Sequence, residues 1–162
     1  MKNKIVKGVF IACISALVIS CNAKNEAPAT PLVDKDQIKK DIQAKENEFA
    51  DLYNKGELKD IGYYADDATT FFPNRAPLVG KDSIVSFLKS DLYSNTDKLS
   101  FNTNEVFVSN DANQVVEVGY FKLVDSSNAI INTGNYMSLF EKRNDKYVCV
   151  RDMSASDMPV KN

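Results

Sequence analysis

Residues 63–73, with the sequence YYADDATTFFP, and residues 78–84, with the sequence LVGKDSI, mark a change from helix to strand and back. Helical spacing of apolar residues ends near Tyr64, and residues 68–72 are of types that favour strands. Residues 73–77 predict a turn, and Gly80 precedes a helix expected over residues 82–93. We therefore expect this junction to form the floor and rim of a pocket in a small α+β domain.

The first twenty residues have the pattern of a secretory signal. Three lysines precede an apolar run that is too short, and wrongly flanked, to span a membrane. Small or aliphatic residues at positions 18–20 lead into Cys21, which resembles a bacterial lipobox. That resemblance implies cleavage after Ser20, a diacylglycerol thioether on Cys21, and a chain lipid-anchored in the bacterial cell envelope, facing the periplasm or the outside. The alternative is an ordinary cleaved signal in which Cys21 has no role.

The rest of the chain is expected to be a short tether followed by one domain. Residues 21–33 contain two prolines and no periodicity, which predicts a flexible tether between lipid and domain. The domain is expected over residues 34–158, a length sufficient for one core. Without residues 1–20 the formal charge falls from −2 to −5, because Lys2, Lys4 and Lys7 are removed. An acidic chain without a basic cluster argues against a nucleic-acid partner.

The sequence contains no histidine. This excludes His-based catalytic dyads and triads and most catalytic zinc sites. Asp66 and Asp67 are adjacent but lack the spacing of a calcium loop, so we predict neither a metal site nor a cofactor. Cys149 lies in an apolar alternation and is expected to be a buried small residue rather than a nucleophile.

Three helices are expected before the sheet. The first, over residues 34–54, has apolar residues on one face and charged residues such as Glu46 on the other, and it ends before Gly56. A short second helix is expected over residues 57–64. The third is the helix that follows Gly80.

From Leu99 onward the apolar residues alternate with period two, which indicates strands. The expected strands are residues 99–109, 114–125, 130–143 and 146–157. Polar turns separate them, so consecutive strands should be antiparallel neighbours. The middle strands are apolar on both faces, which predicts that helices cover one face and a second subunit the other. A homodimer is therefore expected.

Three features of the sequence resemble the nuclear transport factor 2-like superfamily. They are the order of the elements, the sequence YADDAT at residues 64–69 and the sequence VGKDSI at residues 79–84. The resemblance is closest to its ketosteroid-isomerase-related and SnoaL-like branch, including bacterial domains of unknown function, and covers residues 36–158. It implies an α+β, cone-shaped fold of three N-terminal helices packed on a strongly curved antiparallel sheet. The motifs are more specific for fold than for function, because this scaffold hosts enzymes, carriers and adaptors.

Positions that carry catalysis in the isomerases hold apolar residues here. The resemblance places the catalytic aspartate at Phe72 and the two oxyanion donors at Phe49 and Met137. An enolate would find neither a base nor a donor, so isomerisation of this design is excluded. Related dehydratases need histidine, and the Asp-Arg-Asp arrangement of the epoxide hydrolases is not reproduced by the adjacent Arg151 and Asp152.

If Phe72 and Met137 mark the inward face, alternation predicts a mostly apolar cavity with a few polar groups. Alternation also turns Thr70, Leu139, Val148 and Ser154 inward. The candidate ligand-binding residues are Phe49, Tyr53, Tyr64, Phe72, Asn135, Met137, Val150 and Asp152. Asp152 is read either as a buried carboxylate that acts as base or ligand anchor, or as a strand-end carboxylate that reaches solvent.

Three functions remain open from the sequence. The leading one is a lipid-anchored, dimeric domain that binds a small, largely apolar molecule without chemistry of its own. The second is a lyase or hydrolase acting on a small hydrophobic metabolite, with Asp152 as base and Tyr53 or Tyr64 as acid. The third is an adaptor whose second sheet face binds a protein. Phe49 and Phe72 favour binding over catalysis, so no catalytic residue is assigned.

Overall fold

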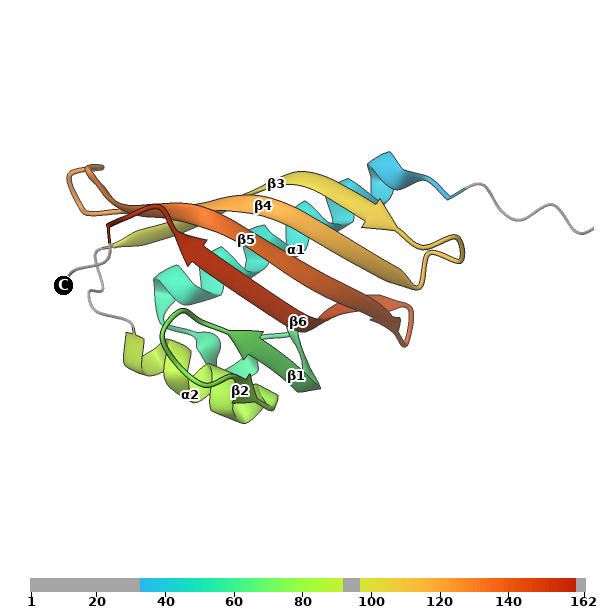
Figure 1. Cartoon of the computed structure of the whole chain (residues 1–162), viewed down its shortest axis with the longest axis horizontal. Coiled ribbons are helices and arrows are strands. Elements are labelled where there is room, and N and C mark those ends of the chain that lie inside the picture. Colours follow the sequence, from blue (N-terminus) through green and yellow to red (C-terminus); the bar gives the residue numbers. More distant parts are fainter. Residues whose placement is uncertain (1–32, 92–96, 160–162) are drawn as a thin grey trace, which may run out of the picture. The chain divides into compact units, whose positions relative to one another are not determined.

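The computed structural model describes residues 33–91 and 97–159, which form two α-helices, one 3₁₀ turn and six strands (Figure 1). The predicted signal peptide, Cys21 and all of the predicted tether except Val33 lie outside the described residues. Within the described part, no helix is both long and apolar enough to cross a membrane. The α+β class expected from the sequence is confirmed.

Helix α1 (Lys35–Lys55) begins and ends one residue later than the expected range of 34–54, and its caps are the Asp34 and Gly56 that the sequence indicates. The Asp34 side chain caps its start by accepting a hydrogen bond from the Gln37 backbone N–H at 2.9 Å. Gly56 ends it with φ 72°, a left-handed conformation in which a side chain is disfavoured. One face of the helix is buried, and it contains an acidic residue, Glu46, among apolar ones. The placement of Glu46 on the charged outer face was wrong.

The expected second helix is a single 3₁₀ turn, η1 (Leu58–Asp60). Ile61 is already extended, with φ −58° and ψ 115°, and Tyr64 begins the first strand. Leu58 and Ile61 are both fully buried, so the apolar spacing that suggested a helix reflects one tight turn that places both in the core. The expectation of three helices was therefore wrong. The remaining expected helix is α2 (Lys81–Asp91).

The six strands form one sheet in the order β2-β1-β6-β5-β4-β3. Their bounds are β1 (Tyr64–Phe71), β2 (Leu78–Val79), β3 (Lys98–Val108), β4 (Gln114–Val124), β5 (Ile130–Arg143) and β6 (Lys146–Ser156). Strands β3 to β6 are antiparallel neighbours, as predicted, but β1 is parallel to β6. No hairpin joins β1 to β6, so local turn chemistry does not determine the direction of that pairing. The sheet is mixed, and the prediction of an antiparallel sheet was wrong.

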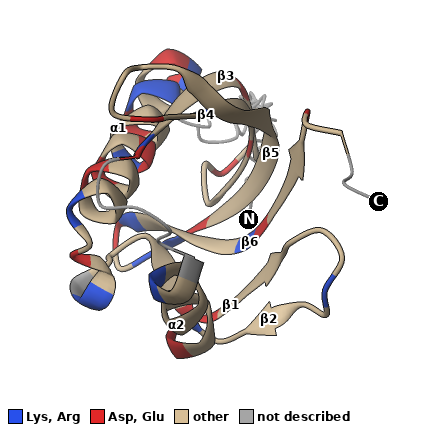
Figure 2. Ribbon diagram, turned by 90° about the vertical axis from the view of Figure 1, so that its left-hand side faces the viewer, with Lys and Arg blue, Asp and Glu red and all other residues tan. Residues whose placement is uncertain are grey.

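The sheet is not strongly curved, which corrects the cone-shaped architecture expected from the resemblance. The four long strands have 11 to 14 residues and pair along most of their length. Each of their three ladders contains a single register shift. Helix α1 lies across the face of these strands beside β3, and α2 packs against β1 and β2 (Figure 2). These contacts place the core between α1 and one face of the sheet.

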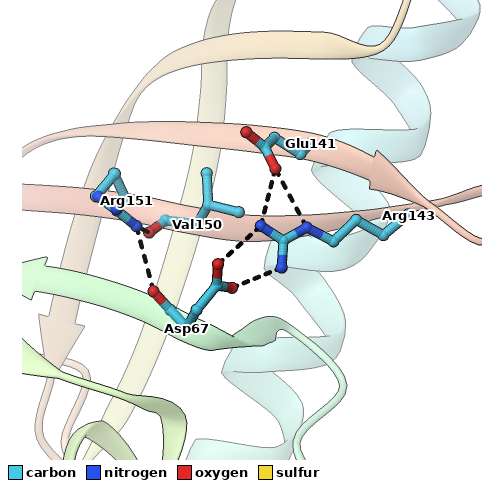
Figure 3. A network of polar contacts seen from close by, with 5 residues as sticks. All are labelled: Asp67, Glu141, Arg143, Val150 and Arg151. Carbon is cyan, nitrogen blue, oxygen red and sulfur yellow. Dashed lines mark hydrogen bonds and ion pairs between the residues drawn. The ribbon is translucent and has the colours of Figure 1, made fainter.

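A network of hydrogen bonds and ion pairs connects β1 to its neighbour β6 and to β5 beyond it (Figure 3). Arg143 donates two hydrogen bonds to the Asp67 carboxylate and further ones to Glu141, the closest at 2.9 Å. The Arg151 guanidinium donates to the Asp67 backbone carbonyl at 3.3 Å. The hydrogen bond from Arg143 lowers the pKa of Asp67. Asp67 thus holds strands together, and no group of three acidic, Cys or His side chains in the described segments could hold a metal ion.

Candidate functional site

A cavity of about 360 Å³ lies between α1, β1 and the face of the sheet that α1 covers. Aromatic side chains from α1, from β1 and its flanks, and from β3 to β5 form much of its wall: Phe49, Tyr53, Tyr63, Tyr64, Phe72, Phe101, Phe121 and Tyr136. Seven polar or acidic residues also line it: Glu46, Thr70, Asn132, Ser138, Asp152, Ser154 and Ser156. Apolar walls with a few placed polar groups are the usual composition of a small-molecule site.

The aromatic wall is a connected cluster centred on Phe49. The Phe49 ring lies 5.0 Å from the Tyr63 ring and 5.5 Å from the Phe101 ring, both edge-on. The Phe101 ring in turn lies 5.3 Å from the Tyr136 ring. Edge-to-face contacts of this kind favour one arrangement of the rings, so the wall is held in shape by its own packing.

Asp152 is the acidic group that β6 presents to the cavity. It pairs in register with Thr70 of β1 and with Ser138 of β5, so it lies in the middle of the sheet. The Tyr64 hydroxyl donates to its Oδ2 at 2.9 Å, and the Thr70 hydroxyl donates to its Oδ1. Burial raises the pKa of Asp152 to about 7, against the opposing effect of the Tyr64 hydrogen bond. Near neutral pH this carboxyl group can therefore both accept and release a proton.

A second acidic group, Glu46 of α1, was missed in the sequence. Its Oε1 accepts a hydrogen bond from the Tyr63 hydroxyl at 2.5 Å. Burial, and then the neighbouring Glu117 charge, raise the pKa of Glu46 well above its usual range. The available signal was its spacing, since Glu46 falls four residues after Ile42 and three before Phe49, both of which are buried.

Glu117 of β4 lies beyond Glu46 and is fully buried. Its Oε1 accepts hydrogen bonds from Thr103 at 2.5 Å and from Tyr136 at 2.8 Å. Its Oε2 is buried and accepts no hydrogen bond from the described residues, so a proton on Glu46 would supply the donor that this oxygen lacks. The two glutamates form a buried acidic pair under the cavity.

The structure brings five of the candidate ligand-binding residues together around the cavity: Phe49, Tyr53, Tyr64, Phe72 and Asp152. Thr70 and Ser154 also line it, as alternation predicts, whereas Leu139 and Val148 do not. Val150 is buried but lies outside the wall, because it falls at the register shift between Cys149 and Arg151.

The predicted orientation of β5 was wrong by one residue. Asn135 and Met137 do not line the cavity, and Met137 is 46 % exposed. The adjacent Tyr136 and Ser138 face inward instead. The gapless match that placed an oxyanion donor at Met137 therefore selected an outward position. A hydroxyl group, that of Ser138, occupies the inward one.

Comparisons with known proteins identify the fold. No protein-family model and no curated protein sequence matches the chain. An NTF-2-like protein of unknown function from Shewanella oneidensis is 23 % identical, with a TM-score of 0.60; the match covers 72 % of this chain and 98 % of that one. An NTF2-like protein with a cystatin-like fold from Novosphingobium aromaticivorans is 11 % identical, with a TM-score of 0.66, over 76 % and 85 % of the two chains.

A ketosteroid isomerase-like protein from Erwinia carotovora atroseptica is 17 % identical, with a TM-score of 0.59, over 74 % of this chain and 96 % of that one. Identities this low show a shared fold and leave the activity open. The two-helix, six-strand domain with its cavity beside α1 thus has the NTF2-like fold, also described as cystatin-like.

Proposed function

We propose that the domain binds a small, largely apolar molecule in the cavity, with Asp152 as the polar anchor. The observation that supports this best is the combination of a cavity of about 360 Å³, aromatic walls and the centrally placed carboxyl group of Asp152. An apolar body would contact the rings around Phe49, and one polar group would reach Asp152. A few polar groups in an apolar pocket typically orient such a ligand.

Native mass spectrometry of the protein, gently extracted from the cells that produce it, tests this proposal. We expect a bound small molecule that is lost from Ser154→Phe, because Ser154 lines the cavity and a phenyl ring would fill part of it. Ser100→Phe is the matched control, because Ser100 is exposed and outside the cavity. Absence of any bound molecule, or equal retention by Ser154→Phe, would contradict the proposal.

Proton-transfer catalysis is the second candidate function. It is favoured by the Asp152 pKa of about 7 and by the Tyr64 hydroxyl 2.9 Å away, which resemble a base and its neighbouring acid. In a lyase or hydrolase, Asp152 would remove a proton from a substrate carbon or from water, and Tyr64 or Tyr53 would donate one. However, both Asp152 oxygens already accept hydrogen bonds, which stabilise the carboxylate and weaken it as a base. Conversion of the recovered ligand by the native protein, absent in Asp152→Asn, would establish catalysis.

We also propose that Cys21 anchors the mature chain to a bacterial envelope membrane through acyl chains. The lipobox-like residues 18–21 support this, and two or more acyl chains hold a protein stably where one does not. Cys21→Ala should move the protein from the membrane fraction to the soluble one, and the N-terminal peptide of the native protein should carry the mass of the acyl chains. An unmodified N-terminal peptide would refute the anchor.

A homodimer formed through the sheet face opposite α1 completes the proposal. Large apolar side chains are exposed there, among them Met137 and Tyr120. The same surface would serve the adaptor function if its partner were a different protein. Self-association is preferred because it needs no partner beyond this chain.

A further inference from the structure

The cavity has a one-sided charge. Glu46 and Asp152 line it from α1 and β6, and none of the described residues in its wall is a lysine or an arginine. Arg75 stacks on the Phe87 ring at 4.0 Å but does not line the cavity. A ligand that complements this site has to balance acidic groups rather than basic ones.

The acidic groups act on one another through the cavity floor. The Asp152 and Glu117 charges both raise the pKa of Glu46, and the buried Glu117 Oε2 lacks a donor unless Glu46 carries a proton. Buried carboxylates without a counter-charge are costly, so burial raises the pKa values of Glu46 and Asp152 and favours their protonated forms. A positive charge in the cavity would remove that cost without any rearrangement of the chain.

The aromatic wall has the matching chemistry. The Phe49, Phe101 and Tyr136 rings form a continuous surface, and Phe49 also contacts the Tyr64 ring, whose hydroxyl holds Asp152. Aromatic faces carry partial negative charge and attract ammonium groups within about 6 Å, most strongly where water is excluded. Carboxylate and rings thus surround the same space.

We propose that the ligand is a small organic cation, an amine or quaternary ammonium group on an apolar body, held by Asp152 and the aromatic wall around Phe49. This rests on the proposed function and narrows it to one chemical class. The ammonium group takes the place of the missing counter-charge, and the apolar body fills the remaining volume. No covalent step is involved.

Binding of a cation should be linked to the protonation of Asp152. Four titratable groups interact with Asp152, and none of them is basic. They are Tyr63, just before β1, Tyr64 on β1, Glu46 on α1 and Cys149 on β6. A bound cation therefore favours the ionised carboxylate and expels its proton. Affinity for a cation should rise as the pH passes upward through about 7, the pKa of Asp152.

Isothermal titration calorimetry of the purified full chain with three probes tests the inference. The probes 2-phenylethylamine, 2-phenylethanol and 3-phenylpropanoate share a phenyl ring but are cationic, neutral and anionic. Above the pKa of Asp152 we expect the amine to bind at least about 10-fold more tightly than the alcohol, and the carboxylate most weakly. The amine affinity should rise about several-fold from one pH unit below that pKa to one above, while that of the alcohol stays constant.

Two variants with the same change in net charge locate the effect. Asp152→Asn should weaken amine binding by about 10-fold and remove its pH dependence, with alcohol binding within about 3-fold of native. Retained alcohol binding shows that this variant is folded. Asp66→Asn removes an exposed carboxylate outside the cavity and should leave all three affinities unchanged.

The outcomes separate this inference from the function on which it rests. If the alcohol binds as tightly as the amine, or if Asp152→Asn and Asp66→Asn bind the amine equally well, the cationic ligand is refuted and the binding cavity stands. If 3-phenylpropanoate binds most tightly of the three probes, the cationic ligand is likewise refuted and the binding cavity stands. If none of the three probes binds, the cavity proposal fails and the ligand class fails with it.

Discussion

Asp152 shows how a single residue combines stability and chemistry in this domain. Its position opposite Thr70 and Ser138 is set by strand register, and that position buries a group that water would otherwise solvate. Tyr64 and Thr70 donate hydrogen bonds that compensate the carboxylate in part, yet burial still raises its pKa to about 7. A carboxyl group held this way costs stability, which is the usual mark of a functional position.

The raised pKa makes stability depend on pH in a defined direction. The folded chain binds the Asp152 proton more tightly than the unfolded chain, in which the pKa is near 4, so the free energy of unfolding falls as the pH rises between about 4 and about 7. The loss amounts to roughly 4 kcal/mol at full ionisation. Asp152→Asn should be more stable than the native protein above pH 7 and show a flatter pH profile in urea unfolding. An unchanged profile would mean that Asp152 is solvated.

Tyr63 is the residue that makes the buried Glu46 tolerable. Its hydroxyl donates the 2.5 Å hydrogen bond to Glu46, and burial raises the pKa of the phenol well above its usual range, so it remains a donor. Tyr63→Phe should lower the free energy of unfolding by about 1–3 kcal/mol, because it leaves a buried oxygen without its partner. Tyr120→Phe, which removes an exposed hydroxyl, should change it by less than about 0.5 kcal/mol. Equal effects in denaturant titrations would disprove this role.

The pairing of β4 with β5 explains how the sheet supports an aromatic wall. Gly119 lies opposite Tyr136, and Gly134 lies opposite Phe121, so each ring covers a glycine on the neighbouring strand. A Cβ atom at Gly119 would be 2.4 Å from the Tyr136 ring, and one at Gly134 would be 2.4 Å from the Phe121 ring. Both rings line the cavity, so these glycines provide the space that the wall occupies.

Substitution of Gly119 should therefore damage both stability and the site. Gly119→Ala forces the Tyr136 ring to move and should destabilise the fold by about 1–3 kcal/mol. The same substitution should also weaken the hydrogen bond that the Tyr136 hydroxyl donates to Glu117, which is 2.8 Å long in the native protein. Gly62→Ala is the matched control, because no atom lies within 4 Å of a Cβ there, and it should be neutral or stabilise by up to about 1 kcal/mol. Thermal unfolding of both variants checks this prediction. Equal unfolding temperatures for Gly119→Ala and Gly62→Ala would exclude the steric explanation.

Elements held by local patterns could be predicted from the sequence, and those decided by distant contacts could not. The limits of α1 follow from the Asp34 cap and Gly56, and the hairpins of β3 to β6 follow from polar turns. The parallel pairing of β1 with β6 joins segments about 80 residues apart without a turn to orient them. The inward face of β5 was predicted on the assumption that Met137 points into the cavity. Because side chains alternate along a strand, an error of one residue exchanges all of its inward and outward positions.

The acidic part of the site was the hardest to predict. Hydrophobic patterns assign charged residues to the surface, whereas Glu46 and Glu117 are buried at positions that an apolar residue would suit. Only Asp152 was singled out, from its place on the inward parity of the last strand. Predicting the glutamate pair would have required knowing that Glu46 of α1 and Glu117 of β4 meet in the core, which is tertiary information.

At the scale of the whole molecule, the sheet has two faces with different roles. The helix-covered face contains the core and the cavity. On the other face, Phe71, Met153, Met137 and Val118 form one row across β1, β6, β5 and β4, each in register with the next. Phe71, Met153 and Met137 are exposed, and Val118 is half-buried. A row of apolar side chains across four strands is typical of a protein interface. It is the basis for expecting a homodimer.

Met137 lies in the middle of that row, so a charge there should disrupt the dimer. In sedimentation velocity, the native full chain should be dimeric at micromolar concentration, and Met137→Glu should weaken association by about 100-fold, because an unpaired carboxylate would be buried between subunits. Ile130→Glu is the matched control, since Ile130 is on the same strand, is 64 % exposed against 46 % for Met137, and lies outside the row. It should remain dimeric.

Ligand binding provides the internal check on this experiment. Met137 does not line the cavity, so a folded Met137→Glu monomer should still bind 2-phenylethylamine with native affinity. If Met137→Glu loses both dimerisation and amine binding, the variant is misfolded. Tyr120→Glu, on the same outer face, then serves as the test variant instead. A native protein that is monomeric at all concentrations would refute the dimer and assign the row to another partner. Met153, which both lines the cavity and belongs to the row, would then be where that partner could sense the ligand.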